Sequence, residues 1–588
     1  MNMEPIENEG NEEEEINEEE LEEIGYIIGE STPFKVLVLS RTPPNIGEYV
    51  LIKHQEGHLL GMVEDSIAGN PFIPENLTNI VSFENWRNIV DGRNYTRGVI
   101  RILTKIQPLL RGRRFEPPRN PPAPSSPVFK ANDEILKRIF LPSDLQDDSA
   151  LYHYSRSEKK GYVRIGVLAN HPNVPVFINV DSLVSRHSAI LAVTGAGKSN
   201  TVSILAERMV EGLGATILLF DMHSEYTESR IADRRTNIIK PRINPSSLTI
   251  WELYKLARIR EDAVKQQSVL RYAYKKAREY MSELLQSDPA ELSKFDIIDY
   301  MMDVLECLES FSEGAGRRSG SKSMEESRER EEKRSGVKDP CSKLSNIPKK
   351  LDRDVVLSVE GKLEDLKDVY KDIISIHGPK SIKEIVKQGY LNIVDLGEVD
   401  DVGSDVVASY LLRRILEERK AYVRNREPGY PVPVYIFIEE AHILVPRDYD
   451  TLTKEIVSKI AREGRKFGVG ISLVSQRPKS IDENSLSQTN NKIILKIVEP
   501  NDLKYVQNSS ELLSDELLSM LPSLRTGEAI LLGEFTKLPA LVKIDEHLGK
   551  RAGRDLNIAE LWQKNANITL DQTKEEIEDM LYPSEGPD

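Results

Sequence analysis

Apolar residues in the first part of the chain come in short runs separated by Gly, Pro and Asn. These runs predict strands at residues 26–29, 35–39, 48–52, 98–103 and 162–167. Many short strands joined by polar turns are typical of a small barrel. We therefore predict an N-terminal β-barrel over residues 24–170, which carries no catalytic cluster and serves assembly or docking.

A different pattern follows, in which apolar runs alternate with stretches of helical spacing. The runs predict buried strands at residues 188–193, 215–220, 391–396, 434–438 and 471–475. Buried strands that alternate with helices are typical of an α/β domain with a largely parallel sheet. We predict such a core over residues 171–252 and 388–545, with a C-terminal extension over residues 546–588.

The two parts of the core are separated by residues 253–387, which are rich in charge. Helical spacing recurs at residues 262–285 and 360–374 and predicts a helical insertion with a solvated face. Within it, residues 313–338 are rich in Ser, Gly, Arg and Glu and almost free of apolar residues. That composition predicts a disordered tip.

Composition narrows the class of protein only slightly. The 588 residues carry a net charge of −16, but the first 23 contribute twelve Glu and no Lys or Arg, which leaves −4 for the rest. We predict an acidic disordered tail over residues 1–23 and a body that can hold a basic channel. No apolar run reaches membrane-spanning length, so no membrane association is expected. With no secretory signal, and with Cys307 and Cys341 outside any metal-ligand spacing, the chain suits the reducing cytoplasm.

The strongest motif lies between the strand at 188–193 and a helical run that stops at Gly214. The sequence Ala-Val-Thr-Gly-Ala-Gly-Lys-Ser, from Ala192 to Ser199, matches a phosphate-binding loop except that the pattern asks for Gly at 192. Alanine costs little there if its φ is negative. Lys198 is predicted to reach the β- and γ-phosphates of ATP, and Ser199 to ligate Mg²⁺. Nucleotide contacts are predicted at Thr194, Gly195, Ala196, Gly197, Lys198, Ser199 and Asn200.

Acidic residues end two of the predicted strands. Asp221 closes the strand at 215–220, where it either faces the nucleotide or caps a turn. Glu439 and Glu440 follow the strand at 434–438 and match the Walker B pattern. We assign Glu439 to the metal ion and Glu440 to the general base that polarises the attacking water.

Two further polar residues flank the strand at 471–475. Gln476 follows this strand, where a polar side chain can sense the γ-phosphate and orient water. Arg465 precedes the strand and is a candidate for stabilising transition-state charge, although a surface cation at a helix end is an equal interpretation.

Together these motifs resemble the HerA family of DNA translocases in the FtsK/HerA superfamily. The resemblance covers roughly residues 24–560. Its most specific parts are Glu-Glu-Ala-His at 439–442 and Ala-Arg-Glu-Gly-Arg-Lys-Phe-Gly at 461–468. The β-rich N-terminal region is similar to the HAS-barrel of that family, and the family's loop usually begins with Gly where this chain has Ala192.

The resemblance implies a RecA-like P-loop ATPase core, built into a homohexameric ring with ATP and Mg²⁺ at the subunit interfaces. It also implies that double-stranded DNA, or else single-stranded DNA, passes through the channel, and that a NurA-like nuclease is the partner in recombination repair. By position, Arg186, Arg465 and Asp221 match residues that the family places at the nucleotide. Two alternatives are a conjugative or membrane-associated DNA pump and an ATPase scaffold that does not translocate.

Overall fold

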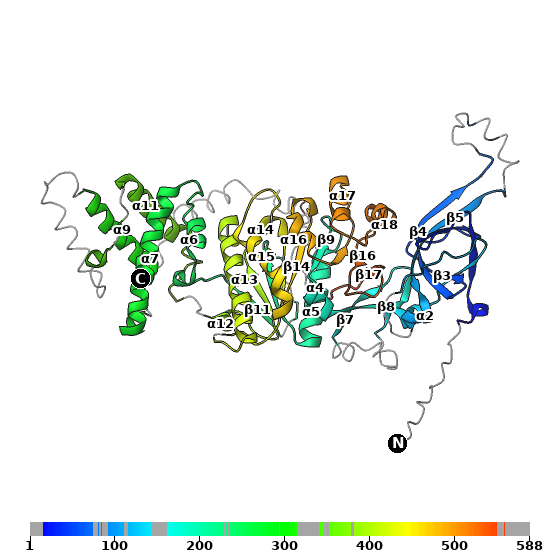
Figure 1. Cartoon of the computed structure of the whole chain (residues 1–588), viewed down its shortest axis with the longest axis horizontal. Coiled ribbons are helices and arrows are strands. Elements are labelled where there is room, and N and C mark those ends of the chain that lie inside the picture. The colour runs from blue at the N-terminus through cyan, green and yellow to red at the C-terminus, as the bar shows by residue number, and fades with distance from the viewer. Residues whose placement is uncertain are drawn as a thin grey trace, which may run out of the picture.

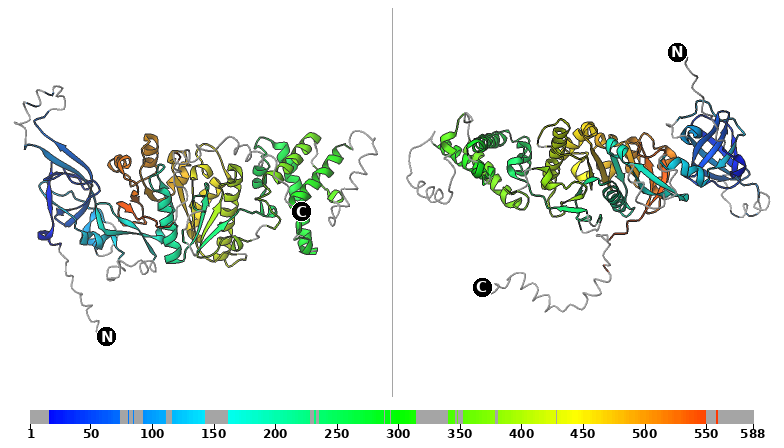
Figure 2. Two further views of the ribbon diagram at one scale, coloured as in Figure 1. Left: turned by 180° about the vertical axis from the view of Figure 1, so that it is seen from behind. Right: turned by 90° about the horizontal axis from the view of Figure 1, so that it is seen from below.

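The computed structural model of the chain is elongated, with three parts in a row (Figure 1). A barrel lies at one end, an α/β sheet in the middle and a group of helices at the other end, an order that the views in Figure 2 share. Among the described residues no helix is long and apolar enough to cross a membrane.

The structure describes most of the chain. The described residues are 16–549 and 558, without 74–79, 81–83, 85–91, 111–115, 143–160, 228–230, 233–234, 288, 293, 314–339, 346, 348–351, 378–380 and 428. The predicted disordered tip therefore lies almost wholly outside the described residues, as do most of the acidic tail and of the C-terminal extension. Those three predictions stay predictions.

The N-terminal region is a closed six-stranded barrel, as predicted. Its strand order is β1-β2-β5-β4-β3-β6. Alternate side chains point inward, as Val36 and Val38 do on β2, and they form a core of the barrel's own. The bounds are β1 (Glu23–Ile28), β2 (Lys35–Ser40), β3 (Tyr49–His54), β4 (Gly57–Gly69), β5 (Tyr95–Lys105) and β6 (Pro127–Lys130).

Two features of the barrel differ from the sequence prediction. Strands β4 and β6 were not predicted, because Gly and charged residues interrupt the apolar pattern of β4 and β6 follows a proline-rich loop. The predicted strand at 162–167 is real, but it belongs to the large sheet, where it pairs antiparallel with β17. The barrel therefore ends at β6, and the prediction that it extends to residue 170 is wrong.

The central sheet has eleven strands in the order β11-β12-β10-β13-β14-β9-β15-β16-β17-β7-β8. The first seven are mutually parallel and the last four are joined by antiparallel pairing. The bounds are β7 (Tyr162–Leu168), β8 (His171–Asn179), β9 (Ser188–Leu191), β10 (Thr216–Asp221), β11 (Thr236–Ile239), β12 (Leu391–Asp395), β13 (Val434–Ile438), β14 (Val469–Ser475), β15 (Asn491–Ile494), β16 (Glu528–Leu532) and β17 (Ala540–Ile544).

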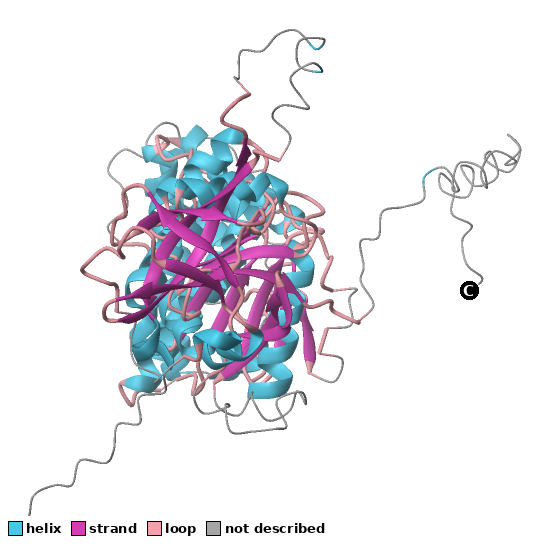
Figure 3. Cartoon of the chain, turned by 90° about the vertical axis from the view of Figure 1, so that its right-hand side faces the viewer, coloured by secondary structure: helices cyan, strands magenta, loops and turns pink. Residues whose placement is uncertain are grey.

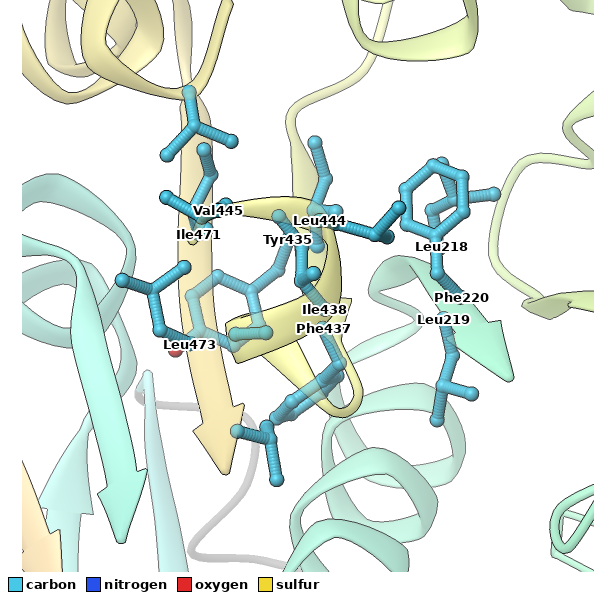
Figure 4. Packing of buried hydrophobic residues seen from close by; sticks show 14 of the residues in the cluster. Leu218, Leu219, Phe220, Tyr435, Phe437, Ile438, Leu444, Val445, Ile471 and Leu473 are labelled. Carbon is cyan, nitrogen blue, oxygen red and sulfur yellow. The ribbon is translucent and has the colours of Figure 1, made fainter. Parts of the chain in front are cut away.

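The parallel strands form the centre of the core, and most of their residues are buried. All residues of β10, β13 and β14 are buried, which explains why their sequences are apolar runs without alternation. Figure 4 shows side chains of these three strands packing with Leu444 and Val445. Figure 3, seen from the barrel end, shows the strands surrounded by helices.

Helices on the sheet include α5 against β10 and β12, and α4, α14 and α15 against β14. Outside the insertion, the helix bounds are α2 (Ile106–Leu110), α3 (Asp133–Phe140), α4 (Val180–Arg186), α5 (Lys198–Leu213), α13 (Asp401–Val423), α14 (Ala441–Leu444), α15 (Leu452–Glu463), α16 (Glu483–Ser487), α17 (Pro500–Asn508) and α18 (Asp515–Met520). The 3₁₀ turns are η1 (Glu18–Glu20), η4 (Pro245–Ser247), η6 (Gly464–Phe467), η7 (Pro478–Ser480) and η8 (Leu521–Ser523).

Most of the chain between β11 and β12 forms the group of helices at the far end in Figure 1, whereas α12 lies beside α13 at the sheet. The two predicted helical stretches are found in α7 and α11, which pack against each other and against α9. Cys307 of α9 and Cys341 of η5 form a disulfide with a Cα–Cα distance of 5.4 Å, where we expected two thiols. The bounds are α6 (Ile250–Leu256), α7 (Val264–Ser287), α8 (Pro289–Leu292), α9 (Ile297–Glu313), η5 (Pro340–Lys343), α11 (Arg353–Val369) and α12 (Ile382–Ile385).

The barrel and the sheet meet at a buried histidine. His171, on β8, lies 2.8 Å from Glu48 beside β3 and 2.7 Å from Asp133 at the start of α3. Burial alone would lower the pKa of His171, but the two carboxylates outweigh it and raise the pKa. Tyr49 adds a direct bond by donating its hydroxyl to the carbonyl of Pro539 at 2.5 Å. The barrel is thus joined to the sheet by buried polar contacts as well as by apolar packing.

Candidate nucleotide-binding site

The loop between β9 and α5 has the backbone that a phosphate-binding loop needs. Gly195 and Gly197 adopt φ of 77° and 109°, in the left-handed region that favours glycine. A Cβ built on Gly195 would meet nothing within 4 Å, so this side of the loop is open. Ala192 is fully buried and does not have a positive φ, which confirms that alanine is tolerated there. The loop therefore presents the open Gly195 and the N-terminus of α5, a combination that suits a phosphate group.

Lys198, the first residue of α5, is held between the two Walker B carboxylates. Its Nζ lies 2.5 Å from Oε1 of Glu439 and 2.6 Å from Oε1 of Glu440, and all three side chains are largely buried. Burial would lower the pKa of Lys198, but the carboxylates raise it, so the ammonium stays charged. The charge that would meet phosphate is thus compensated within the protein.

The two carboxylates differ in their affinity for protons. Burial raises the pKa of Glu439 to about 7, against the opposing effect of Lys198. For Glu440 the effect of burial is outweighed by His442 and Lys198, which lower the pKa to about 2. With Lys198 in this position, Glu439 is the acid more ready to take a proton, and Glu440 is an ionised carboxylate.

Glu440 also has an unusual backbone. Its φ of 46° and ψ of 47° are left-handed, which is uncommon for a residue with a side chain. The residue sits between β13 and α14, so the sharp turn brings its carboxylate back toward Lys198 rather than into α14. Backbone strain of this kind is concentrated at functional sites, where the surrounding fold enforces it.

Asp221 is fully buried at the end of β10, and its carboxylate serves the turn that follows. It accepts hydrogen bonds from the backbone N–H of Glu225, Tyr226 and Thr227 at 3.1, 2.9 and 3.0 Å, and from the Thr227 hydroxyl at 3.1 Å. Of the two interpretations of Asp221, the structure favours the turn cap.

The capped turn brings a different acid to the phosphate loop. Glu225 accepts a hydrogen bond from the Ser199 hydroxyl at 2.9 Å, and its charge contributes to raising the pKa of Glu439. Sequence reasoning missed Glu225. The available signal was a second acid four residues beyond the acid that ends the strand.

Two other predicted residues contact the loop or its helix. Thr194 donates its hydroxyl to the amide oxygen of Gln476 at 2.5 Å, so Gln476 lies at the loop as predicted. Asn200 is engaged elsewhere, because its amide donates to the carbonyl of Asp545 at 2.8 Å and its oxygen accepts from the N–H of His547 at 2.9 Å. In this structure the Asn200 side chain binds the segment after β17 and does not point toward the nucleotide side of the loop.

Both predicted arginines lie at the opposite edge of the sheet. Arg186 precedes β9, and its Nε donates to Glu534 at 3.1 Å. Arg465 is exposed on η6, which precedes β14. Since β14 spans seven residues at about 3.3 Å each, roughly 20 Å separates Arg465 from the edge where Lys198 lies. Neither arginine can reach the phosphate loop of its own chain.

The residues beside the loop fit Mg²⁺ together with ATP. Oε2 of Glu439 is buried and has no hydrogen-bond partner, and hydroxyl and carboxylate oxygens are the ligands that Mg²⁺ prefers. Within the described part of the chain, no group of three or more His, Cys, Asp or Glu residues could hold a metal ion by itself. This agrees with the usual binding of Mg²⁺ by one or two protein oxygens, water and substrate phosphates.

A phosphate loop on β9, a Walker B pair on β13 and a polar residue after the intervening β14 define a RecA-like P-loop ATPase. The family model "Helicase HerA, central domain" matches residues 163–415, and the model "HAS barrel domain" matches residues 24–108. The chain belongs to the HerA helicase family and is an ATP-dependent helicase or translocase.

Relatives extend over nearly the whole chain. A probable helicase of Methanocaldococcus jannaschii is 36% identical, covering 95% of this chain and 98% of the relative. The DNA double-strand break repair helicase HerA of Saccharolobus solfataricus is also 36% identical, covering 92% and 96%. The enzyme of the same name from Pyrococcus furiosus is 28% identical, covering 92% and 97%.

Solved structures similar to this chain are more distant. VirB4 of Thermoanaerobacter pseudethanolicus is 15% identical with a TM-score of 0.44, covering 66% of this chain and 96% of VirB4. The plasmid coupling protein TrwB in complex with ADP and Mg²⁺ is 15% identical with a TM-score of 0.40, covering 65% and 89%.

Proposed function

We propose that this chain is an ATP-driven DNA translocase and helicase that processes DNA ends for recombination repair. The names of the relatives, which are double-strand break repair helicases, support the DNA substrate and the repair role. The observation that carries the motor function is the pairing of Lys198 with Glu439 and Glu440 at the carboxyl ends of neighbouring strands. We place the enzyme in the cytoplasm, with a NurA-like nuclease as its partner.

The proposed mechanism begins with an exchange of partners at Lys198. When ATP enters the loop, its phosphates replace the carboxylates as partners of the ammonium, and both Glu439 and Glu440 become free to act. Ser199 and Glu439 would hold Mg²⁺, which when bound neutralises charge on the phosphates. Glu440 would then accept the proton of the attacking water, and Gln476 would orient that water from the end of β14.

The proton affinities described above belong to the state before this exchange. Loss of the Lys198 ammonium from both carboxylates removes a charge that lowers the pKa of each. The pKa of Glu440 should therefore rise, which improves it as a base. The assignment of Glu439 to the metal ion and Glu440 to the base remains our proposal.

We further propose that the site is completed by a neighbouring subunit in a homohexamer. Transition-state charge on the phosphates calls for a cation, which in related phosphoryl-transfer enzymes is an arginine supplied in cis or in trans. Arg465 and Arg186 lie about one strand length away from their own loop but on the edge that a neighbouring copy could approach. Arg465 is our first candidate because it is exposed, whereas Arg186 is paired with Glu534.

The test of this function is a comparison of ATP turnover with and without duplex DNA, together with strand separation on a duplex with a single-stranded end. We expect DNA to stimulate turnover, and addition of a NurA-like nuclease to yield resected ends. Particle images of the chain with DNA and an ATP analogue should show six-fold rings threaded by DNA. ATP turnover that is indifferent to DNA would leave an ATPase scaffold as the better description.

A further inference from the structure

A polar hollow of about 490 Å³ lies beyond the nucleotide site. It is bounded by the segment that follows α14, by η7 and by α17. The residues that give it its chemistry are Arg447, Lys479, Lys504, Asn501, Asn508 and Tyr505.

Two of the three cations that line this hollow are available to a ligand, and the third has a carboxylate beside it. Arg447, Lys479 and Lys504 are all exposed, and within the described part of the chain neither Arg447 nor Lys504 makes an ion pair. Lys479 is 3.5 Å from Glu499. The guanidinium of Arg447 makes a cation–π contact with the ring of Tyr505, at 5.3 Å from the ring centre.

The walls of the hollow continue the two strands that carry the catalytic residues. Arg447 lies seven residues after Glu440, and Lys479 lies three residues after Gln476. The two segments are joined to each other, because Arg447 N–H donates to the Ser480 carbonyl at 2.9 Å and Asp482 N–H donates to the Val445 carbonyl at 3.0 Å.

A chain of polar contacts also runs from the Walker B acid to this wall. Nδ1 of His442 lies 3.2 Å from Oε2 of Glu440 and 3.2 Å from the Ser475 hydroxyl oxygen. That same oxygen accepts the N–H of Arg477 at 3.0 Å, directly before η7. A continuous run of polar contacts through two side chains therefore leads from Glu440 to the segment that carries Lys479.

We propose that this hollow binds the phosphodiester backbone of duplex DNA and couples DNA contact to the ATPase cycle, an inference that rests on the proposed function. Exposed Arg and Lys side chains with neighbouring exposed amides, here Asn501 and Asn508, are the set that contacts DNA phosphates without reading sequence. Two acids, Asp448 and Glu483, also line the hollow and oppose the entry of acidic groups other than at the cations. The three cations lie on three different segments, after α14, in η7 and in α17, which favours contacts to successive phosphates of one backbone over a compact anion.

The first experiment measures duplex affinity of the full chain as a function of salt, with a non-hydrolysable ATP analogue present. Because log K falls as log salt rises, each lost phosphate contact makes this negative slope shallower by about 0.9. We expect Arg447→Ala to lose one such step, and Arg447→Ala with Lys504→Ala to lose about two. Arg447→Lys should restore most of the slope because it keeps the charge. Lys371→Ala, an exposed lysine in the insertion, is the matched control and should keep the wild-type slope.

A wild-type slope in the folded double variant would overturn the proposal. A second result would also overturn it. If the double variant keeps the wild-type salt slope for DNA but binds the ATP analogue more weakly when no DNA is present, the hollow binds a free phosphate group instead. If the wild-type chain itself binds no DNA, the proposed function fails, and this outcome is distinguishable because it precedes any substitution.

The second experiment tests the coupling. Ser475→Ala removes the oxygen shared by His442 and Arg477 but leaves the cations in place. We expect duplex affinity to stay within about two-fold of the wild type, while the ratio of DNA-stimulated to DNA-free turnover falls several-fold. An unchanged ratio would show that the polar chain does not carry the signal.

Discussion

The two edges of the central sheet are built on opposite principles. At the carboxyl ends of the strands, Lys198 is buried and paired with Glu439 and Glu440, so charge is compensated before any ligand arrives. At the amino ends, Arg465 is exposed on η6, and Arg186 meets only a partly exposed glutamate. In the proposed function the first edge binds ATP, and the second supplies the transition-state cation to a neighbouring subunit. The predictions that follow test this proposed division, from the largest effect to the smallest.

Lys198→Ala should have the largest effect. The change removes the ammonium that lies between the two Walker B acids and would meet the phosphates, and it leaves two buried carboxylates without their cation, so ATP turnover should fall to background. A melting curve should show that the variant is folded. Turnover near the wild-type rate would contradict the assignment of this edge as the nucleotide site.

Glu440→Gln should lower hydrolysis by about two to four orders of magnitude, because the amide keeps the shape of the base but not its basicity. ATP should still bind, which a fluorescent analogue can measure in the same preparation. Glu439→Gln is the matched comparison. In this variant, ATP binding should depend less on added Mg²⁺ than it does in the wild type. If the two variants exchange these behaviours, the roles of the two acids are reversed.

Mixing subunits tests the division between the edges directly. Arg465→Ala and Glu440→Gln chains should each be inactive alone and regain activity when mixed before assembly. At equal amounts about a quarter of the interfaces pair an intact Glu440 with a neighbour's intact Arg465, because each half is intact with a probability of one half. No recovery in verified mixed rings would return Arg465 to a role within its own subunit, and the same experiment with Arg186→Ala decides between the two arginines.

Glu225→Gln should have the smallest effect of these four. The amide still accepts the Ser199 hydroxyl but removes a negative charge beside the proposed metal site. We expect a few-fold higher Mg²⁺ concentration for half-maximal nucleotide binding, measured by titration without turnover. Glu211→Gln, on the exposed side of α5, is the control and should leave this concentration unchanged.

The sequence predicts the motifs of the first edge well, because each lies directly after a buried apolar run. The carboxyl ends of parallel strands lie at the same edge of a sheet. Once the strands were recognised, Lys198, Glu440 and Gln476 were therefore expected to lie close together. The barrel, predicted from short strands with polar turns, and the RecA-like core, implied by the family resemblance, are both confirmed, although the barrel ends before residue 170.

Other features depend on contacts that no local pattern records. The pairing of β7 with β17 brings together segments almost 400 residues apart, and the turn that presents Glu225 depends on three hydrogen bonds to a buried carboxylate. The disulfide between Cys307 and Cys341 likewise depends on how α9 and η5 meet. The far-edge position of the arginines follows from the strand direction, and the sequence pattern contained that information.

At Glu440, the left-handed backbone makes catalytic activity and thermal stability depend on the same residue in opposite ways. A side chain held in that conformation costs of order 1–3 kcal/mol, and glycine adopts it without penalty. A search for heat-resistant variants that ignored ATP turnover should therefore favour Glu440→Gly, which relaxes the turn after β13 and destroys the motor. In the proposed mechanism, the strained backbone at Glu440 is therefore a stability cost that accompanies the ability to hydrolyse ATP.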